Sequence, residues 1–158
     1  AMKQVAGTLR LDLASYREKQ AFSQFGSDLD ATTQYQLNHG AHMMEMLKQP
    51  RYSALDVVDQ ICAIYAAKEN FIDDVDLENV ALFRDGLAQY MSEYHPQLRN
   101  SLRSGKISDE QAERLSDHIK HFKAKFMEEH PNKVVDDAEV NADKPGSFDA
   151  VTQGSLQE

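Results

Sequence analysis

Apolar residues recur every three or four positions along most of this chain, the spacing that gathers them on one face of an α-helix. The last such segment is the clearest, with Leu115, Ile119, Phe122 and Phe126 at successive turns. The sequence has no useful run of alternating apolar and polar residues, which is the pattern of a half-buried strand. The pattern therefore predicts an all-α fold, a compact bundle of about five to six helices.

Residues that begin or end helices divide this pattern into segments. Asp30 is a candidate N-cap, and Ser108 with Gln111 three residues later has the form of a capping box. Ser53 with Asp56 approximates the same motif. The predicted helices are residues 8–23, residues 30–49, a helix that opens at Ser53, a helix that follows Asp76, a short turn that begins at Pro96 and a last helix from Ser108. The expected buried stripes include Leu37, Ala41, Met44 and Leu47 in the second segment, and Val80, Phe83, Leu87, Tyr90, Met91 and Tyr94 in the fourth.

The helical pattern stops near His130 and Pro131, and the negative charge gathers beyond that point. The chain has a net charge of −9, and residues 128–158 contain eight acidic residues and two lysines. Residues 131–158 are too polar to bury much surface, so we expect a folded domain of residues 1–130 and a flexible acidic tail of residues 131–158. The acidic balance argues against a nucleic-acid partner, and the sequence lacks an apolar run long enough for direct membrane insertion.

Two pairs of histidines are the candidates for metal binding. His39 and His42 are three residues apart in one predicted helix, and His118 and His121 repeat that spacing in the last helix. One helical turn places each pair on a common face, where imidazoles can bind zinc or copper. The simpler interpretation is that all four are ordinary polar helix positions, because no cysteine lies near them and no HExxH motif is present.

Signs of catalysis are absent from these 158 residues. The single cysteine, Cys62, lies in an apolar stripe and is expected to be buried and inert. The sequence contains neither a GxSxG nucleophile motif nor the glycine-rich loops GxxxxGK[ST] and GxGxxG that bind phosphates. The chain alone is therefore not expected to be a nucleotide hydrolase.

Six short blocks, in order along the chain, carry a resemblance to a known family. They are MKQVAG (2–7), LDLASYR (11–17), QFGSDLD (24–30), LKQ (47–49), IYA (64–66) and GKIS (105–108). Together they make residues 1 to about 126 similar to the C-terminal helical domain of the F-type ATP synthase α subunit. One block departs from the family, because KENF (68–71) stands where a glycine-containing turn is common, which puts the geometry of that turn in question.

The resemblance implies a part of a rotary enzyme rather than a catalyst by itself. In that family, α and β subunits alternate in a hexamer, and each has a P-loop domain upstream of its helical domain. The implied partners are the β subunits, the central stalk γ subunit and the rest of the α subunit. The implied cofactor is ATP with Mg in the full-length subunit, with none for this chain alone. The implied location is intracellular, peripheral on the cytoplasmic face of the bacterial inner membrane, or an organellar equivalent.

Two sites follow from the resemblance. Gln49 matches a glutamine that helps enclose adenine at the non-catalytic nucleotide site, and Arg51 stands where the family usually has a second glutamine. Arginine has donors but no acceptor, so it would contact adenine differently, for example by stacking. The turn with Gly26, Ser27, Asp28 and Asp30 is the expected contact with the rotor stalk.

Two alternatives to this interpretation stay open. The chain could be a free-standing helical interaction module that derives from this domain or merely resembles it. It could also be a small metal-binding helical protein that uses the four histidines described above.

Overall fold

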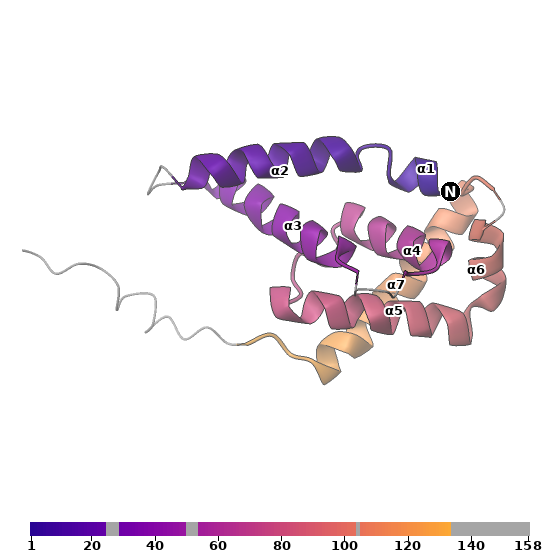
Figure 1. Ribbon diagram of the computed structural model, residues 1–158. Coiled ribbons are helices and arrows are strands. Elements are labelled where there is room, and N and C mark those ends of the chain that lie inside the picture. The colour runs from indigo at the N-terminus through magenta and orange to yellow at the C-terminus, as the bar shows by residue number, and fades with distance from the viewer. Residues whose placement is uncertain (25–28, 50–53, 104, 134–158) are drawn as a thin grey trace, which may run out of the picture.

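The all-α prediction is confirmed by the computed structural model, which describes residues 1–24, 29–49, 54–103 and 105–133. These residues form helices and contain no strand. The elements are α1 (Met2–Val5), α2 (Leu9–Ser23), α3 (Ala31–Leu47), α4 (Val57–Lys68), the 3₁₀-helix η1 (Leu77–Asn79), α5 (Val80–Tyr94), α6 (Pro96–Arg103) and α7 (Asp109–Glu129) (Figure 1). The predicted tail beyond residue 133 lies outside the described residues.

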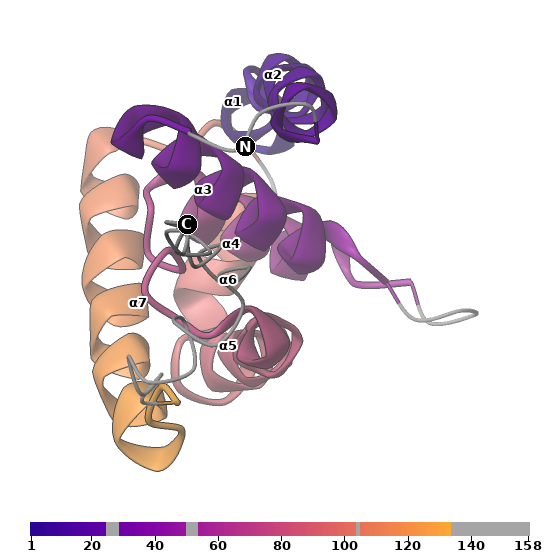
Figure 2. The same cartoon turned by 90° about the vertical axis from the view of Figure 1, so that its left-hand side faces the viewer.

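Helix α4 is the centre of the bundle because its sequence is apolar on nearly every side. Val58 and all seven residues from Ile61 to Ala67 are buried. A helix that is hydrophobic all round must be covered all round, and α4 is in contact with α1, α3, α5, α6 and α7. In the side view, α1 and α2 lie outermost above α3, while α7 runs down one flank of the bundle (Figure 2).

Three of the predicted helix starts rest on capping motifs, and one of these three is wrong. Asp30 accepts a hydrogen bond from the Thr33 N–H, and Ser108 with Gln111 forms the full capping box. Helix α4, in contrast, begins at Val57 with Asp56 as its N-cap, rather than at Ser53, which lies outside the described residues. Asp56 is the N-cap because its carboxylate accepts a hydrogen bond from the Val58 N–H at 2.9 Å. The same carboxylate also binds two arginines, described below.

The buried face of α3 differs from the predicted stripe. Leu37, Ala41, Met44 and Leu47 are only half-buried, whereas the deepest positions belong to Gly40, His42, Met43 and Met46. The reason is that α3 packs against α2, α4 and α5, so that no single apolar stripe is buried alone. His42 fits this interior because its two ring nitrogens each lie 2.7 Å from a backbone carbonyl oxygen, those of Asn38 and Val75. Tyr94, expected in the stripe of α5, is 67% exposed.

Asn70 supplies the turn geometry that the KENF block puts in question. Its φ is 60°, in the left-handed region. Apart from glycine, asparagine is one of the residues that adopt this conformation most readily. The turn closes with the Phe71 N–H donating to the Ala66 carbonyl at 2.9 Å, as at many helix C-termini. Asparagine therefore takes the left-handed position at the end of α4.

Helix α2 is the least buried long element. All of its residues are described and none is buried, and Leu11 and Phe22 are 72% and 75% exposed. It packs on α3, where the absence of a side chain at Gly40 allows a close approach: a Cβ atom there would lie 2.3 Å from the Tyr16 ring. The predicted inner face of α2, Leu9, Leu13 and Tyr16, is half-buried.

The first residues of the expected tail are held against the connection between α4 and α5. The Asn132 side chain donates to the Asp74 carbonyl at 2.6 Å and accepts from the Asp76 N–H at 3.2 Å. The Lys133 N–H donates to the Asp76 carboxylate at 2.8 Å, and its ammonium lies 2.6 Å from Glu78. The chain is therefore fastened for at least three residues after the predicted domain boundary.

Two histidines join the corner between α5 and α6 to α7. The rings of His95 and His118 stack with centroids 3.5 Å apart, and His95 Nε2 lies 3.1 Å from the Tyr90 hydroxyl. Burial lowers the pKa of both rings, the nearby Arg114 and His121 lower it further, and Asp117 opposes the shift at His118. The stack therefore favours neutral imidazoles.

We predict that this stack makes the fold sensitive to acid. Because the folded-state pKa lies below the ordinary value of 6.5, the unfolded chain binds protons more readily, and the free energy of unfolding falls as pH drops below that value. Urea unfolding between neutral and mildly acidic pH measures this loss. His118→Gln is expected to flatten the dependence, and an identical slope in the variant would contradict the assignment.

Gly40→Ala is predicted to disrupt the packing of α2 on α3. The new Cβ overlaps the Tyr16 ring, and overpacking costs about 1–3 kcal/mol, more than the helix propensity gained. Amide exchange is expected to accelerate in α2 while α4 stays protected. Gly105→Ala is the matched control, because its Cβ would meet nothing within 4 Å. Equal stability of the two variants would argue against the close contact.

A pair of truncations tests whether the contacts of Asn132 and Lys133 with residues 74–78, called the clasp below, stabilise the fold. A chain that ends at residue 130 is expected to melt at a lower temperature than a chain that ends at residue 133, because only the longer one retains these contacts. Coincident melting curves would show that the clasp adds no stability.

Candidate functional site

The candidate site begins where α3 ends. The backbone of Lys48, the C-cap of α3, is extended (φ −64°, ψ 135°). The residue after Gln49 is a proline, and a residue that precedes proline disfavours the helical conformation. The Lys48 carbonyl accepts a hydrogen bond from the guanidinium of Arg84 on α5. Arg84 is only 5% exposed, and its Nε donates to Asp85 at 2.8 Å. A buried cation therefore fixes the backbone immediately before Gln49.

Gln49 is exposed, and its side chain turns toward the start of α4. Its Oε1 accepts a hydrogen bond from the Leu55 N–H at 3.4 Å, which leaves its NH₂ group available to donate elsewhere. Beside it is a small hollow of about 30 Å³, lined by Leu47, Leu55 and Gln60 among others. The described residues around this hollow do not by themselves enclose a space of the size of an adenine ring. Arg51 lies outside the described residues.

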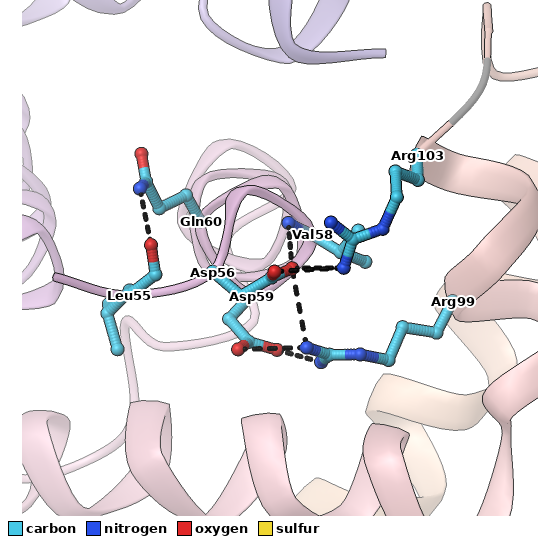
Figure 3. Close-up of polar contacts among 7 residues, drawn as sticks. All are labelled: Leu55, Asp56, Val58, Asp59, Gln60, Arg99 and Arg103. Carbon is cyan, nitrogen blue, oxygen red and sulfur yellow. Dashed lines mark hydrogen bonds and ion pairs between the residues drawn. The ribbon is translucent and has the colours of Figure 1, made fainter.

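A network of two carboxylates and two arginines fixes the start of α4 (Figure 3). Asp56 accepts two hydrogen bonds from Arg103 Nη2, at 2.8 and 3.0 Å. Arg99 donates to both carboxylate oxygens of Asp59 and lies 3.4 Å from Asp56. The Val58 N–H and then Arg103 lower the pKa of Asp56. Helix α6 is thereby tied to the first turn of α4.

Sequence reasoning did not identify these arginines. A signal was available for Arg84, which lies four residues after Val80 and three before Leu87, on the apolar stripe of its helix. A cation at such a position needs a buried partner. Arg99 and Arg103 carried no such signal, because their partners are more than thirty residues away in the sequence.

Of the expected rotor contact, the structure describes Asp30 alone. Gly26, Ser27 and Asp28 lie outside the described residues. Asp30 is exposed and accepts hydrogen bonds from both the hydroxyl and the N–H of Thr33, which together lower its pKa. Its carboxylate is thus charged at neutral pH and fixed at the N-terminus of α3, where a negative charge is favourable.

The four candidate metal-binding histidines each have other surroundings. His39 Nδ1 lies 2.7 Å from Asp73, whose carboxylate also accepts from the Tyr35 hydroxyl, and His42 is bound to backbone carbonyls. His118 stacks on His95, and the His121 ring lies 6.5 Å from the Tyr90 ring. Among the described residues, no three His, Cys, Asp or Glu side chains are grouped so as to hold a metal. Cys62 is buried, and burial raises the pKa of its thiol to about 12, as an inert thiol requires.

Comparison with known proteins identifies the domain. The family described as "ATP synthase alpha/beta chain, C terminal domain" matches residues 1–122. The chain belongs to this family. It is also similar to curated proteins named "ATP synthase subunit alpha": 48% identical over 124 residues to that of Streptococcus equi subsp. zooepidemicus, and 48% over 123 residues to that of Streptococcus uberis. Each match covers 78% of this chain.

This ATP synthase C-terminal domain spans about a quarter of the length of those curated relatives. Its family match ends within α7, so the clasp at Asn132 and Lys133 lies beyond it. None of its helices in the described part of the chain is long and apolar enough to cross a membrane.

Proposed function

We propose that this chain acts as the C-terminal domain of the non-catalytic α subunit of a proton-translocating F-type ATP synthase. The observation that carries the proposal is its 48% identity, over 78% of the chain, to proteins named ATP synthase subunit alpha. The role is mechanical and structural. The domain packs beside β subunits and the central γ stalk, on the peripheral, cytoplasmic side of the membrane, and transmits rotor position by rigid movement of helices.

The proposed nucleotide role falls to Gln49. Its NH₂ group is free to donate to a ring nitrogen of adenine, while its oxygen is engaged by Leu55. Arg51, two residues later, is the proposed second contact. The phosphates and Mg would be bound by the P-loop domain of the full-length subunit, since the present sequence contains no phosphate-binding loop.

The rotor contact is proposed for the turn between α2 and α3. The end of α2 and the start of α3 lie at one extremity of the domain, away from α4 (Figure 1). Asp30 places a fixed carboxylate there, and the neighbouring Asp28 adds a second acidic residue in the sequence. Two acidic groups would steer a basic surface of the stalk toward this turn, at a strength that salt reduces.

The size and location of the native protein test the proposal. An antibody against this domain is expected to detect a membrane-associated band of roughly three times the 17.9 kDa of this chain in fractions of the source cells. The reason is that the matched region makes up 78% of this chain but only 25% of the relative, so the relative is about three times as long as this chain. A soluble band near the mass of the chain itself would instead support the free-standing interaction module.

A further inference from the structure

A continuous series of contacts leads from α6 to Gln49. Arg103 and Arg99 bind the carboxylate of Asp56, and Asp56 is the residue after Leu55. The backbone of Leu55 is bound on both sides. Its carbonyl accepts from Gln60 Nε2 at 2.8 Å (Figure 3). Its N–H donates to Gln49 Oε1 at 3.4 Å. From the other direction, Arg84 binds the Lys48 carbonyl, one residue before Gln49.

We infer that Arg103 and Arg99 of α6, together with Arg84 of α5, are positioning residues for the Gln49 side chain. Arg84 fixes the backbone that enters Gln49, and the α6 arginines fix the backbone group that its side chain binds. The inference rests on the proposed function of Gln49 as an adenine contact. It adds that the orientation of this glutamine is set by two helices other than its own.

The geometry of the pairs suits positioning better than stabilisation. Arg103 is 51% exposed and Asp56 33%, and exposed ion pairs contribute little to the free energy of unfolding. Arg103 nevertheless contacts both Asp56 oxygens from one nitrogen, Nη2. Arg99 donates from two nitrogens to the two oxygens of Asp59, a forked geometry that restricts the direction of α6 against α4. Loss of the Arg103 side chain should therefore release Leu55 and Gln49 while the bundle stays folded.

Hydrogen exchange at the Leu55 amide, measured in the 158-residue chain, reports whether the Gln49 side chain keeps its orientation, because the Leu55 N–H donates to Gln49 Oε1. Arg103→Gln is expected to accelerate that exchange by roughly three- to tenfold, the worth of one neutral hydrogen bond. Gln49→Ala is expected to do the same. Arg114→Gln, which changes an exposed arginine of α7 outside the network, is the matched control and should leave the rate unchanged.

The conservative variant separates geometry from charge. Arg103→Lys keeps the positive charge and loses the planar guanidinium whose Nη2 contacts both Asp56 oxygens, so it is expected to restore only part of the protection. Unchanged exchange at Leu55 in Arg103→Gln, with an intact helical spectrum, would overturn the inference. Should Arg99→Gln or Arg84→Gln unfold the chain, the exposed Arg103 still decides the question.

The role of Gln49 itself is tested separately in the parent enzyme purified from source cells. Gln49→Ala is expected to lower the amount of adenine nucleotide retained after gel filtration, relative to guanine nucleotide. An unchanged ratio would remove the proposed adenine contact without affecting the exchange result. A changed ratio for Gln49→Ala with none for Arg103→Gln would keep the contact and remove the positioning role.

Discussion

Burial of α4 on all sides is the constraint on which the rest of the structure depends. An α-helix that is apolar nearly all round cannot lie at a surface, so five other helices must cover it. Its polar groups then need partners inside the bundle. The Tyr65 hydroxyl finds them on α7, at the Ser116 hydroxyl (2.9 Å) and the Ala112 carbonyl (3.2 Å). The first turn of α4 finds them on α6, in Asp59 bound to Arg99.

That burial also determines what the candidate site can be. Because α4 is held by its neighbours, Asp56 at its N-terminus is a fixed point, and the segment from Lys48 to Leu55 is attached to fixed points at both described ends. Among the described residues, the hollow beside Gln49 has a volume of about 30 Å³, too small to enclose a base. A base would need further groups beyond these described residues, such as Arg51 or groups of the full-length subunit.

The sequence predicts those features that depend on neighbours along one helix. Asp30 and the Ser108–Gln111 pair were predicted as caps because a cap needs only the next three residues. Features that depend on tertiary contacts escaped it. Ser53 and Asp56 look alike as helix starts in the sequence, which does not show that Asp56 also binds Arg103, a residue brought near by the fold. The burial of His42 likewise depends on the Val75 carbonyl, which no periodicity in α3 reveals.

The opposite case to α4 is α2, and the contrast bears on the proposed transmission of rotor position. No residue of α2 is buried, and it relies on a close approach at Gly40 rather than on large side chains inserted into a core. Elements held by few buried contacts open at lower cost than those in a core. The end of the domain that carries Asp30 is therefore the more easily displaced, while the end that carries Gln49 is fixed through Arg84, Arg99 and Arg103. Helix α3 joins Asp30 to Lys48 and packs directly on α4, so it connects the two ends of the domain.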